Sequence, residues 1–185
     1  MSASFNGGGI IPGTESWFAL SVVPRKEKAT AQTLRAKGYT GFLPMYTVRR
    51  RWSDRVKQVE LPLFPGYVFA RFDPKVRLPI LKIASVMSIL GLGKEPQPIS
   101  DLEIGALQAV CKAGIQAIPY PFLTAGAKVT INEGPLTGVE GILLEAKQSR
   151  LILSVTLLQR SIAVEVDSEW IAPVRLYREF STGLT

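Results

Sequence analysis

Histidine is absent from the 185 residues of this chain, and cysteine occurs once, as Cys111. Without histidine there is no Ser-His or Cys-His nucleophile pair and no histidine-ligated metal site. A single thiol can form neither an internal disulfide nor a cysteine-rich zinc site. Only carboxylate chemistry, lysine chemistry or an oxygen-ligated metal then remains for an enzyme.

Phosphate-binding glycine loops and paired-carboxylate motifs are missing as well. Asp54, Glu60 and Asp73 lie in predicted turns and suggest no catalytic geometry. These absences speak against an enzyme, and the sequence predicts no catalytic residue, metal or cofactor.

Long apolar runs are also lacking. The most apolar window, residues 78–93, is interrupted by Pro79 and Lys82, so no stretch reaches the ~18 apolar residues of a membrane span. Residues 1–16 have neither the basic start nor the apolar run of a signal peptide. We therefore expect a monomeric, cytoplasmic protein without membrane contact.

Positive charge is concentrated in one part of the chain. The net charge is +7, from 22 Lys and Arg against 15 Asp and Glu. Residues 1–110 carry this whole excess, residues 111–185 carry none, and residues 25–57 alone carry +8. This asymmetry indicates two modules with different partners, the first of which has an anionic partner.

The first half mixes strand and helix patterns after a glycine-rich leader at residues 1–16. Aromatic and branched residues predict strands at 17–23, 42–52, 66–72 and 86–92, with a possible return strand at 53–62. Helix patterns occupy 24–37, 101–112 and, in part, 75–83. The order predicts an α+β domain over residues 17–112, an α/β sandwich with a mainly antiparallel sheet.

The helix patterns also predict the residues that face the core. Leu34 faces inward on the first helix, while Leu102, Ala106 and Val110 form one apolar stripe on the last helix. Cys111, on that same helix, is expected to be a small buried residue.

The second half contains only strand patterns. Residues 113–126 have no clear period and include Pro119 and Pro121, which indicates a linker. Strands are predicted at 127–132, 139–146, 150–158, 161–166 and 170–174. They imply a small five-stranded β-barrel over residues 127–174, followed by a C-terminal tail at 175–185.

Two motifs are more specific than these patterns. Residues 62–69 read PLFPGYVF, and residues 126–141 read G-x-x-V-x-I-x-x-G-P-x-x-G-x-x-G. The first resembles the signature of the amino-terminal (NGN) domain of the NusG family. The second resembles the KOW motif, an SH3-like barrel of transcription and ribosomal proteins. With the basic first half, the chain resembles a bacterial NusG-family transcription elongation and antitermination factor over about residues 17–174.

The stretch RRRWSDR at residues 49–55 adds a finer resemblance. It is similar to specialised NusG paralogues of the RfaH and UpxY kind, which are antiterminators of long operons. The general factor usually differs in this loop, so we favour an operon-specialised paralogue over a housekeeping NusG.

The resemblance implies that the first domain binds the clamp helices of the RNA polymerase largest subunit. The residues that match this apolar patch, or that lie on neighbouring strands as pocket walls, are Trp17, Phe64, Pro65, Tyr67, Phe69 and Ile89. Residues 75–80 correspond to the place where the family touches the opposite side of the cleft. A factor that bridges the cleft must favour the closed clamp.

The resemblance also implies that the first domain faces upstream DNA and the exposed non-template strand. The candidates for phosphate contacts are Arg25, Lys26, Lys28, Arg49, Arg50 and Arg51. In the family, the barrel recruits a partner such as ribosomal protein S10 or the Rho terminator. The corresponding loop contains Leu157, Leu158, Gln159 and Arg160. Since housekeeping factors often carry an aromatic residue there, S10 remains a candidate partner and Rho a doubtful one.

Plainer interpretations stay open beside these. Phe64 and Tyr67 could both be core residues that enter a strand, and residues 49–51 could be a solvated strand end. Leu158 could equally be barrel core. A ribosomal or RNA-binding KOW protein is the alternative of another class, although the neutral charge of residues 111–185 speaks against it.

Overall fold

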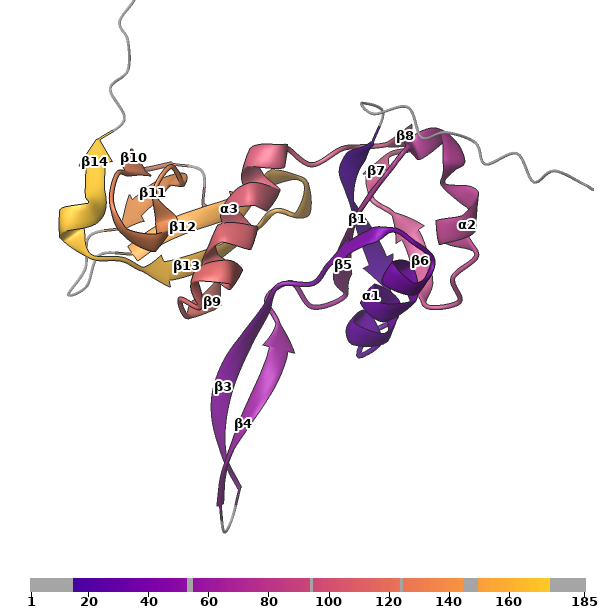
Figure 1. The fold of residues 1–185 in the computed structure, drawn as a ribbon, viewed down its shortest axis with the longest axis horizontal. Coiled ribbons are helices and arrows are strands. Elements are labelled where there is room, and N and C mark those ends of the chain that lie inside the picture. The colour runs from indigo at the N-terminus through magenta and orange to yellow at the C-terminus, as the bar shows by residue number, and fades with distance from the viewer. Residues whose placement is uncertain (1–14, 53–54, 94, 124, 145–149, 174–185) are drawn as a thin grey trace, which may run out of the picture. The chain divides into compact units, whose positions relative to one another are not determined.

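The computed structural model describes residues 15–52, 55–93, 95–123, 125–144 and 150–173 (Figure 1). These residues form two compact units, one of residues 15–43 and 65–101 and one of residues 44–64 and 102–173. The division differs from the predicted domain bounds of 17–112 and 127–174, which stay a prediction. Most of the predicted leader and the predicted tail lie outside the described residues.

A four-stranded antiparallel sheet of order β2-β5-β1-β6 forms the base of the first unit. Its strands are β1 (Ser16–Val22), β2 (Thr40–Phe42), β5 (Tyr67–Phe72) and β6 (Val86–Ile89). The shorter elements are η1 (Pro74–Val76), α2 (Leu78–Leu81), β7 (Gly91–Leu92) and β8 (Glu95–Pro96). The mainly antiparallel sheet predicted from sequence is confirmed.

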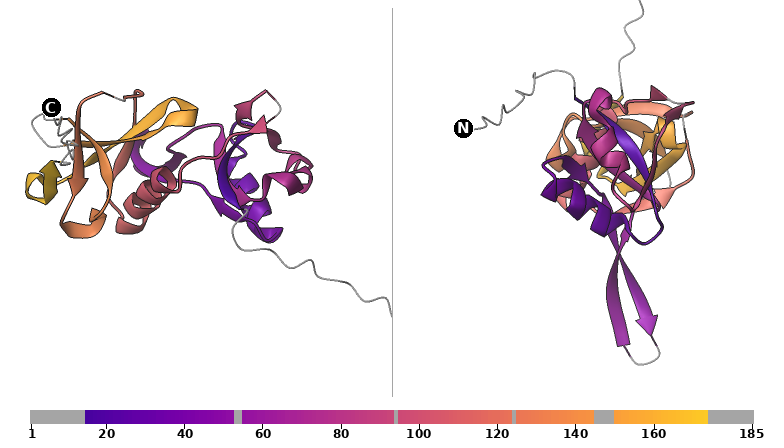
Figure 2. Two further views of the ribbon diagram at one scale, coloured as in Figure 1. Left: turned by 90° about the horizontal axis from the view of Figure 1, so that it is seen from above. Right: turned by 90° about the vertical axis from the view of Figure 1, so that its right-hand side faces the viewer.

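Helix α1 (Glu27–Ala36) packs on one face of this sheet (Figures 1 and 2). Alternate residues of β1 and β5 point toward it, and the rings of Phe18 and Phe72 lie 4.6 Å apart between their centroids. Leu34 of α1 is fully buried in the same cluster, as its position in the helix pattern predicts. This core holds β5 in place and so fixes the strand that carries the first motif.

Two predicted boundaries in the first half are wrong. Helix α1 begins at Glu27 and not at Pro24, because Arg25 adopts a left-handed backbone conformation, with φ of +67°, that ends any continuous helix. The strand predicted at 42–52 is two strands, since it is interrupted before Met45, where Pro44 has no N–H for a ladder.

The second unit contains a long hairpin, a helix and a sheet. Strands β3 (Met45–Trp52) and β4 (Arg55–Pro62) pair in antiparallel register from Met45↔Pro62 to Trp52↔Arg55, which confirms the return strand. Helix α3 (Asp101–Ala113) is followed by β9 (Ala117–Tyr120), β10 (Ala127–Ile131), β11 (Glu140–Leu144), β12 (Arg150–Val155), β13 (Arg160–Glu165) and β14 (Ile171–Pro173). Single turns η2 (Gly134–Leu136), η3 (Thr156–Leu158) and η4 (Ser168–Trp170) lie between them.

The five predicted strands of the second half are present, but the closed barrel is not confirmed. The antiparallel sheet has six strands in the order β14-β10-β11-β12-β13-β9, and within the described residues no pairing joins its two ends. The sixth strand, β9, lies inside the predicted linker at 113–126 and pairs with β13 through Ala117↔Val164 and Pro119↔Ile162. Proline is tolerated there because β9 is an edge strand.

The predicted inward stripe of α3 is confirmed at Val110 and wrong at Leu102. The buried residues are Ile104, Leu107 and Val110, whereas Leu102 is 82% exposed. The buried residues follow one another at a spacing of three, whereas the predicted stripe used a spacing of four. The two spacings coincide at Val110 and diverge toward the start of the helix. Cys111 is exposed and not buried, since it lies beside this face.

Candidate functional site

The first motif forms a turn between β4 and β5. Phe64 is 1% exposed, whereas Pro65 is exposed and Tyr67, at the start of β5, is half-buried. Between them Gly66 has φ of +83°, a conformation that a side chain would strain. The turn therefore buries one ring and presents the next two side chains at the surface.

Three aromatic rings, one each from β1, β2 and β5, are joined by two ring contacts. The Trp17 and Phe42 ring centroids are 6.3 Å apart in an edge arrangement, and those of Phe42 and Phe69 are 6.1 Å apart. Trp17 and Phe69 are buried, while Phe42 is half-buried. Sequence reasoning missed Phe42, although its place in a strand beside β5 could have indicated it.

The six residues predicted for polymerase binding thus separate by burial. Trp17, Phe64 and Phe69 belong to the core, and only Pro65, Tyr67 and Ile89 retain surface. The pattern favours the core interpretation for Phe64. Ile89 pairs with Leu20 and packs against the cluster under α1, so it lies on the opposite face of the sheet from Tyr67, which pairs with Ser21.

A second apolar surface of the first unit follows β5. Val76, at the end of η1, is 55% exposed and Leu78, at the start of α2, is 66% exposed, while Ile80 of α2 is buried. The Asp73 side chain accepts a hydrogen bond of 2.9 Å from the Lys75 amide and so starts η1. This short helical segment holds two large apolar side chains in water.

The predicted DNA-binding residues lie in two groups. Arg25, Lys26 and Lys28 are exposed around the start of α1, and Arg49 and Arg51 are exposed on β3. The side chain of Arg50 lies outside the described part of the chain.

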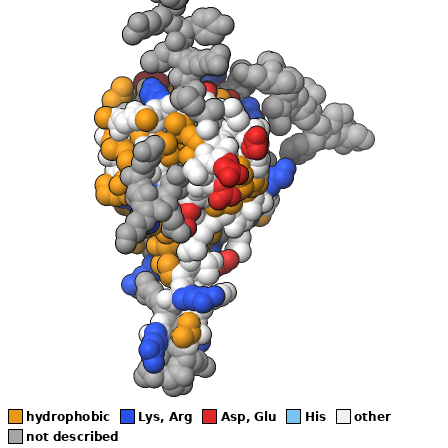
Figure 3. Space-filling model, turned by 90° about the vertical axis from the view of Figure 1, so that its left-hand side faces the viewer, with side chains coloured by type: hydrophobic (Ala, Val, Ile, Leu, Met, Phe, Trp, Pro, Cys, Tyr) orange, Lys and Arg blue, Asp and Glu red, His pale blue; other side chains and the backbone are white. Residues whose placement is uncertain are grey.

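On the hairpin, alternate residues share a face. Arg49 lies opposite Gln58, and Arg51 lies opposite Val56, which is 63% exposed. Figure 3 shows Lys and Arg side chains on this hairpin together with hydrophobic ones. The ribbon therefore presents cations and an apolar group that no core covers.

The predicted partner loop is only partly at the surface. Leu158 is 8% exposed and Leu157 half-buried, while Gln159 and Arg160 are exposed. Gln159 adopts a left-handed conformation with φ of +51°, and its side-chain amide donates a 2.9 Å hydrogen bond to the carbonyl of Thr156. The burial of Leu158 favours the interpretation as core.

Glu103 of α3 holds the start of this loop. Its Oε1 accepts hydrogen bonds of 3.2 Å from the Thr156 amide and 2.8 Å from the Thr156 hydroxyl. Glu103, in the first turn of α3, is thus engaged with a residue far along the chain. The loop is held in one conformation by α3.

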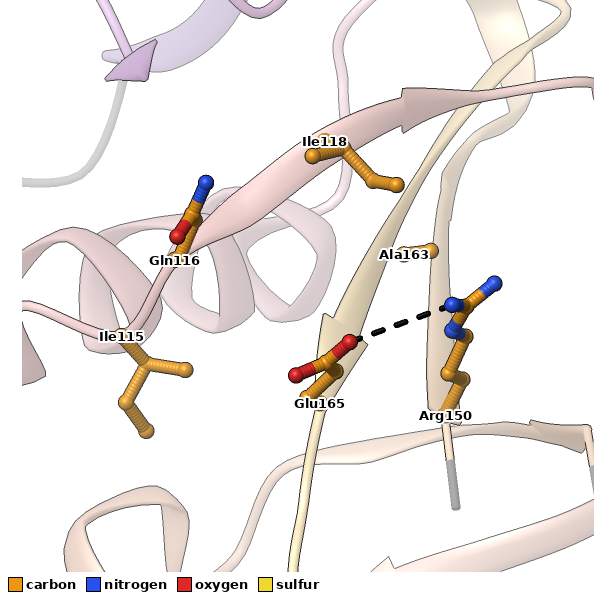
Figure 4. A pocket seen from close by; sticks show the side chains of 6 residues that line it. All are labelled: Ile115, Gln116, Ile118, Arg150, Ala163 and Glu165. Atoms are coloured by element: carbon orange, nitrogen blue, oxygen red, sulfur yellow. Dashed lines mark ion pairs between the residues drawn. The ribbon is translucent and has the colours of Figure 1, made fainter. Parts of the chain in front are cut away.

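An open pocket of about 250 Å³ lies in the second unit (Figure 4). It is lined by Ile115, Gln116, Ile118, Arg150, Ala163 and Glu165, none of which was predicted as a site residue. The Arg150 guanidinium lies 3.8 Å from the Glu165 carboxylate, and both side chains remain largely accessible to water. Such an exposed pair contributes little to stability.

Ionisable groups offer no sign of catalysis in the described part of the chain. There, no three His, Cys, Asp or Glu residues are grouped so that they could hold a metal ion. No helix of the described ranges is long and apolar enough to cross a bilayer. Desolvation raises the pKa of the Cys111 thiol above its ordinary value, and a hydrogen bond with the Met45 backbone opposes this.

Comparison with known proteins gives one consistent result. A family model described as transcription termination factor NusG matches residues 15–108. The chain is 29% identical over 169 residues to the transcription termination/antitermination protein NusG of Buchnera aphidicola, which covers 82% of this chain and 92% of that protein. It is 31% identical over 126 residues to the Escherichia coli K12 protein of the same description, covering 64% of this chain and 66% of that protein. A solved structure of Thermotoga maritima NusG superposes with a TM-score of 0.50 at 19% identity, over 86% of this chain and 97% of the other, and supports the fold alone.

Proposed function

Because the chain belongs to the NusG family, we propose that it is a transcription elongation and antitermination factor that binds RNA polymerase through the turn at residues 64–67. The curated relatives are transcription termination/antitermination proteins. Binding by this chain would suppress pausing or termination. We further propose that it acts as an operon-specialised paralogue and not as the general factor.

The observation that supports polymerase binding is the accessibility of two side chains at the turn. Pro65 is exposed and Tyr67 is half-buried, while Phe64 and Phe69 are buried. Aromatic side chains that lose little entropy on binding are frequent energetic centres of interfaces. Pro65 and Tyr67 would contact the clamp helices directly, whereas Ile89 lies on the α1 face of the sheet and would not share this contact.

Residues 75–80 would contact the opposite side of the polymerase cleft. Val76 and Leu78 are exposed and apolar, which suits a protein contact better than water. A factor that touches both sides shifts the clamp equilibrium only by its differential affinity for the closed state.

The exposed cations would contact upstream or non-template DNA. Three of them are already exposed to solvent and so can reach phosphates: Arg49 and Arg51 on the hairpin, and Arg25 just before α1. Such contacts make affinity depend on salt concentration.

The second unit would recruit a further partner through residues 157–160. Gln159 and Arg160 are its exposed members, so a polar contact is expected. Ribosomal protein S10 is the candidate partner, and Rho is the weaker candidate because the loop lacks an aromatic residue. Leu158 would support the loop from inside.

A pull-down of the tagged chain with host RNA polymerase tests the proposal, followed by single-round transcription on a template with a pause site. Binding with reduced pausing on every template would identify a general factor. Binding with an effect on one leader sequence alone would identify a specialised antiterminator. Failure of the wild-type chain to bind polymerase would overturn the proposal.

A further inference from the structure

Glu27 is a charged residue in an otherwise ordinary place, the first turn of α1, yet its side chain is buried. It is 7% exposed. Burying a carboxylate costs free energy unless hydrogen bonds compensate. An apolar residue of similar size would avoid that cost, so the contacts of Glu27 indicate what the carboxylate does.

Its Oε1 accepts a 2.9 Å hydrogen bond from the backbone amide of Gly66, which lies 39 positions further along the chain. Gly66 is the residue with φ of +83° in the turn between β4 and β5. The Gly66 carbonyl in turn accepts a 2.9 Å hydrogen bond from the Val22 amide at the end of β1. Both the amide and the carbonyl of Gly66 are therefore hydrogen-bonded, the amide to the charged side chain of Glu27.

The position of Glu27 gives this contact additional strength. A hydrogen bond between a carboxylate and a backbone amide is charge-assisted and stronger than a neutral one. The N-terminal end of a helix also stabilises a negative charge. Pro65 and Tyr67 lie on either side of Gly66, so the hydrogen bond from the Gly66 amide to Glu27 restrains the backbone that carries both side chains.

We infer that Glu27 is a positioning residue for partner binding, which orients the Pro65–Tyr67 turn through the Gly66 amide. The inference rests on the proposed function, because it concerns the same polymerase-binding turn. It adds a residue that lies on another element and that makes no contact with the partner.

Thr30 supplies a matched control on the same helix, one turn along. It is fully buried, and its Oγ1 lies 2.7 Å from Ser85 Oγ and donates a 2.8 Å hydrogen bond to the Lys26 carbonyl. Thr30→Val removes these buried contacts but leaves Gly66 untouched. It therefore reports the effect of destabilising α1 alone.

The experiment compares the full chain with Glu27→Ala, Glu27→Gln, Thr30→Val and Tyr67→Ala. Polymerase affinity, thermal unfolding and hydrogen exchange of the Gly66 amide are measured for each. We expect Glu27→Ala to weaken binding about tenfold, the size of one charge-assisted hydrogen bond. Glu27→Gln keeps an acceptor oxygen and should restore most of the affinity, and Thr30→Val should unfold earlier with unchanged affinity. Exchange of the Gly66 amide should quicken only in Glu27→Ala.

The outcomes separate the inference from the proposed function. If Tyr67→Ala loses affinity but Glu27→Ala binds like the wild type, the positioning role is wrong and the binding turn stands. Equal losses in Glu27→Ala and Thr30→Val would reduce Glu27 to a stabilising residue and overturn the inference. If the wild type does not bind polymerase, or if Tyr67→Ala binds polymerase as tightly as the wild type, the proposed function itself fails.

Discussion

Two aromatic residues of one motif, three positions apart, have different environments. Phe64 is 1% exposed and Tyr67 is half-buried. Between them lies Gly66, in a left-handed backbone conformation with φ of +83°. Within the motif, burial therefore assigns stability to the first ring and surface to the second.

Substitutions at these two positions should affect different properties, the stability of the fold at Phe64 and the binding of polymerase at Tyr67. Phe64→Ala should destabilise the protein by about 3–5 kcal/mol because it empties a buried site. Tyr67→Ala should change stability by much less and weaken polymerase binding. Chemical denaturation and a binding titration of each variant measure both. Equal destabilisation by the two changes would contradict the assignment.

Cys111 provides a test that depends on pH. Desolvation raises the pKa of its thiol, so less reactive thiolate is present in the folded chain than in the unfolded chain at the same pH. We expect alkylation by iodoacetamide to be slower in the folded protein below the ordinary cysteine pKa. The two rates should approach each other as the pH rises through the raised pKa. A folded chain that reacts faster at neutral pH would contradict this.

The stability contribution of this thiol has a defined sign. Since its folded pKa lies above the unfolded value, the contribution is fully present below the unfolded pKa. It is lost as the pH rises through the folded pKa.

At the scale of elements, the hairpin β3–β4 is the part that extends basic charge into solvent. Replacing Arg49 and Arg51 with Ser should weaken DNA binding and make the slope of log affinity against log salt shallower by roughly 1.4–1.8, since each phosphate contact contributes ~0.7–0.9. Filter binding or anisotropy across a salt series measures this slope. Lys112 and Lys128, both exposed in the same unit, provide a control pair with the same change of charge. An identical slope in both pairs would remove the hairpin from the DNA surface.

The loop η3 has its own anchor. Glu103→Ala removes the acceptor for both donors of Thr156, so hydrogen exchange of the Thr156 amide should become faster. Glu103→Gln, which keeps an oxygen acceptor, should change it less. If α3 does not hold the loop, all three proteins will exchange at the same rate.

The whole molecule consists of two units with separate buried clusters. Leu34 is buried in the first and Leu151 in the second. We expect Leu34→Ala to accelerate hydrogen exchange mainly in residues 15–43 and 65–101, and Leu151→Ala mainly in the other unit. Each variant is the control for the other, and uniform acceleration by either would show that the units unfold together.

The sequence by itself determined the features that depend on neighbours along the chain. The alternation of apolar residues specified β1, β5 and five of the strands of the second half, β9 excepted, and the pattern around Leu34 specified the inner face of α1. The motifs of residues 62–69 and 126–141 indicated the family, which the match over residues 15–108 shows. These are local properties, because each depends on a few residues within one element.

The tertiary structure decided the properties that depend on distant residues. It buried Phe64 and Leu158, turned Leu102 outward, and added β9 to a sheet that no pairing closes within the described residues. It also brought the Glu27 carboxylate to the Gly66 amide across 39 positions of sequence. Burial and hydrogen bonding are set by what packs against a residue, and no local pattern encodes that neighbour.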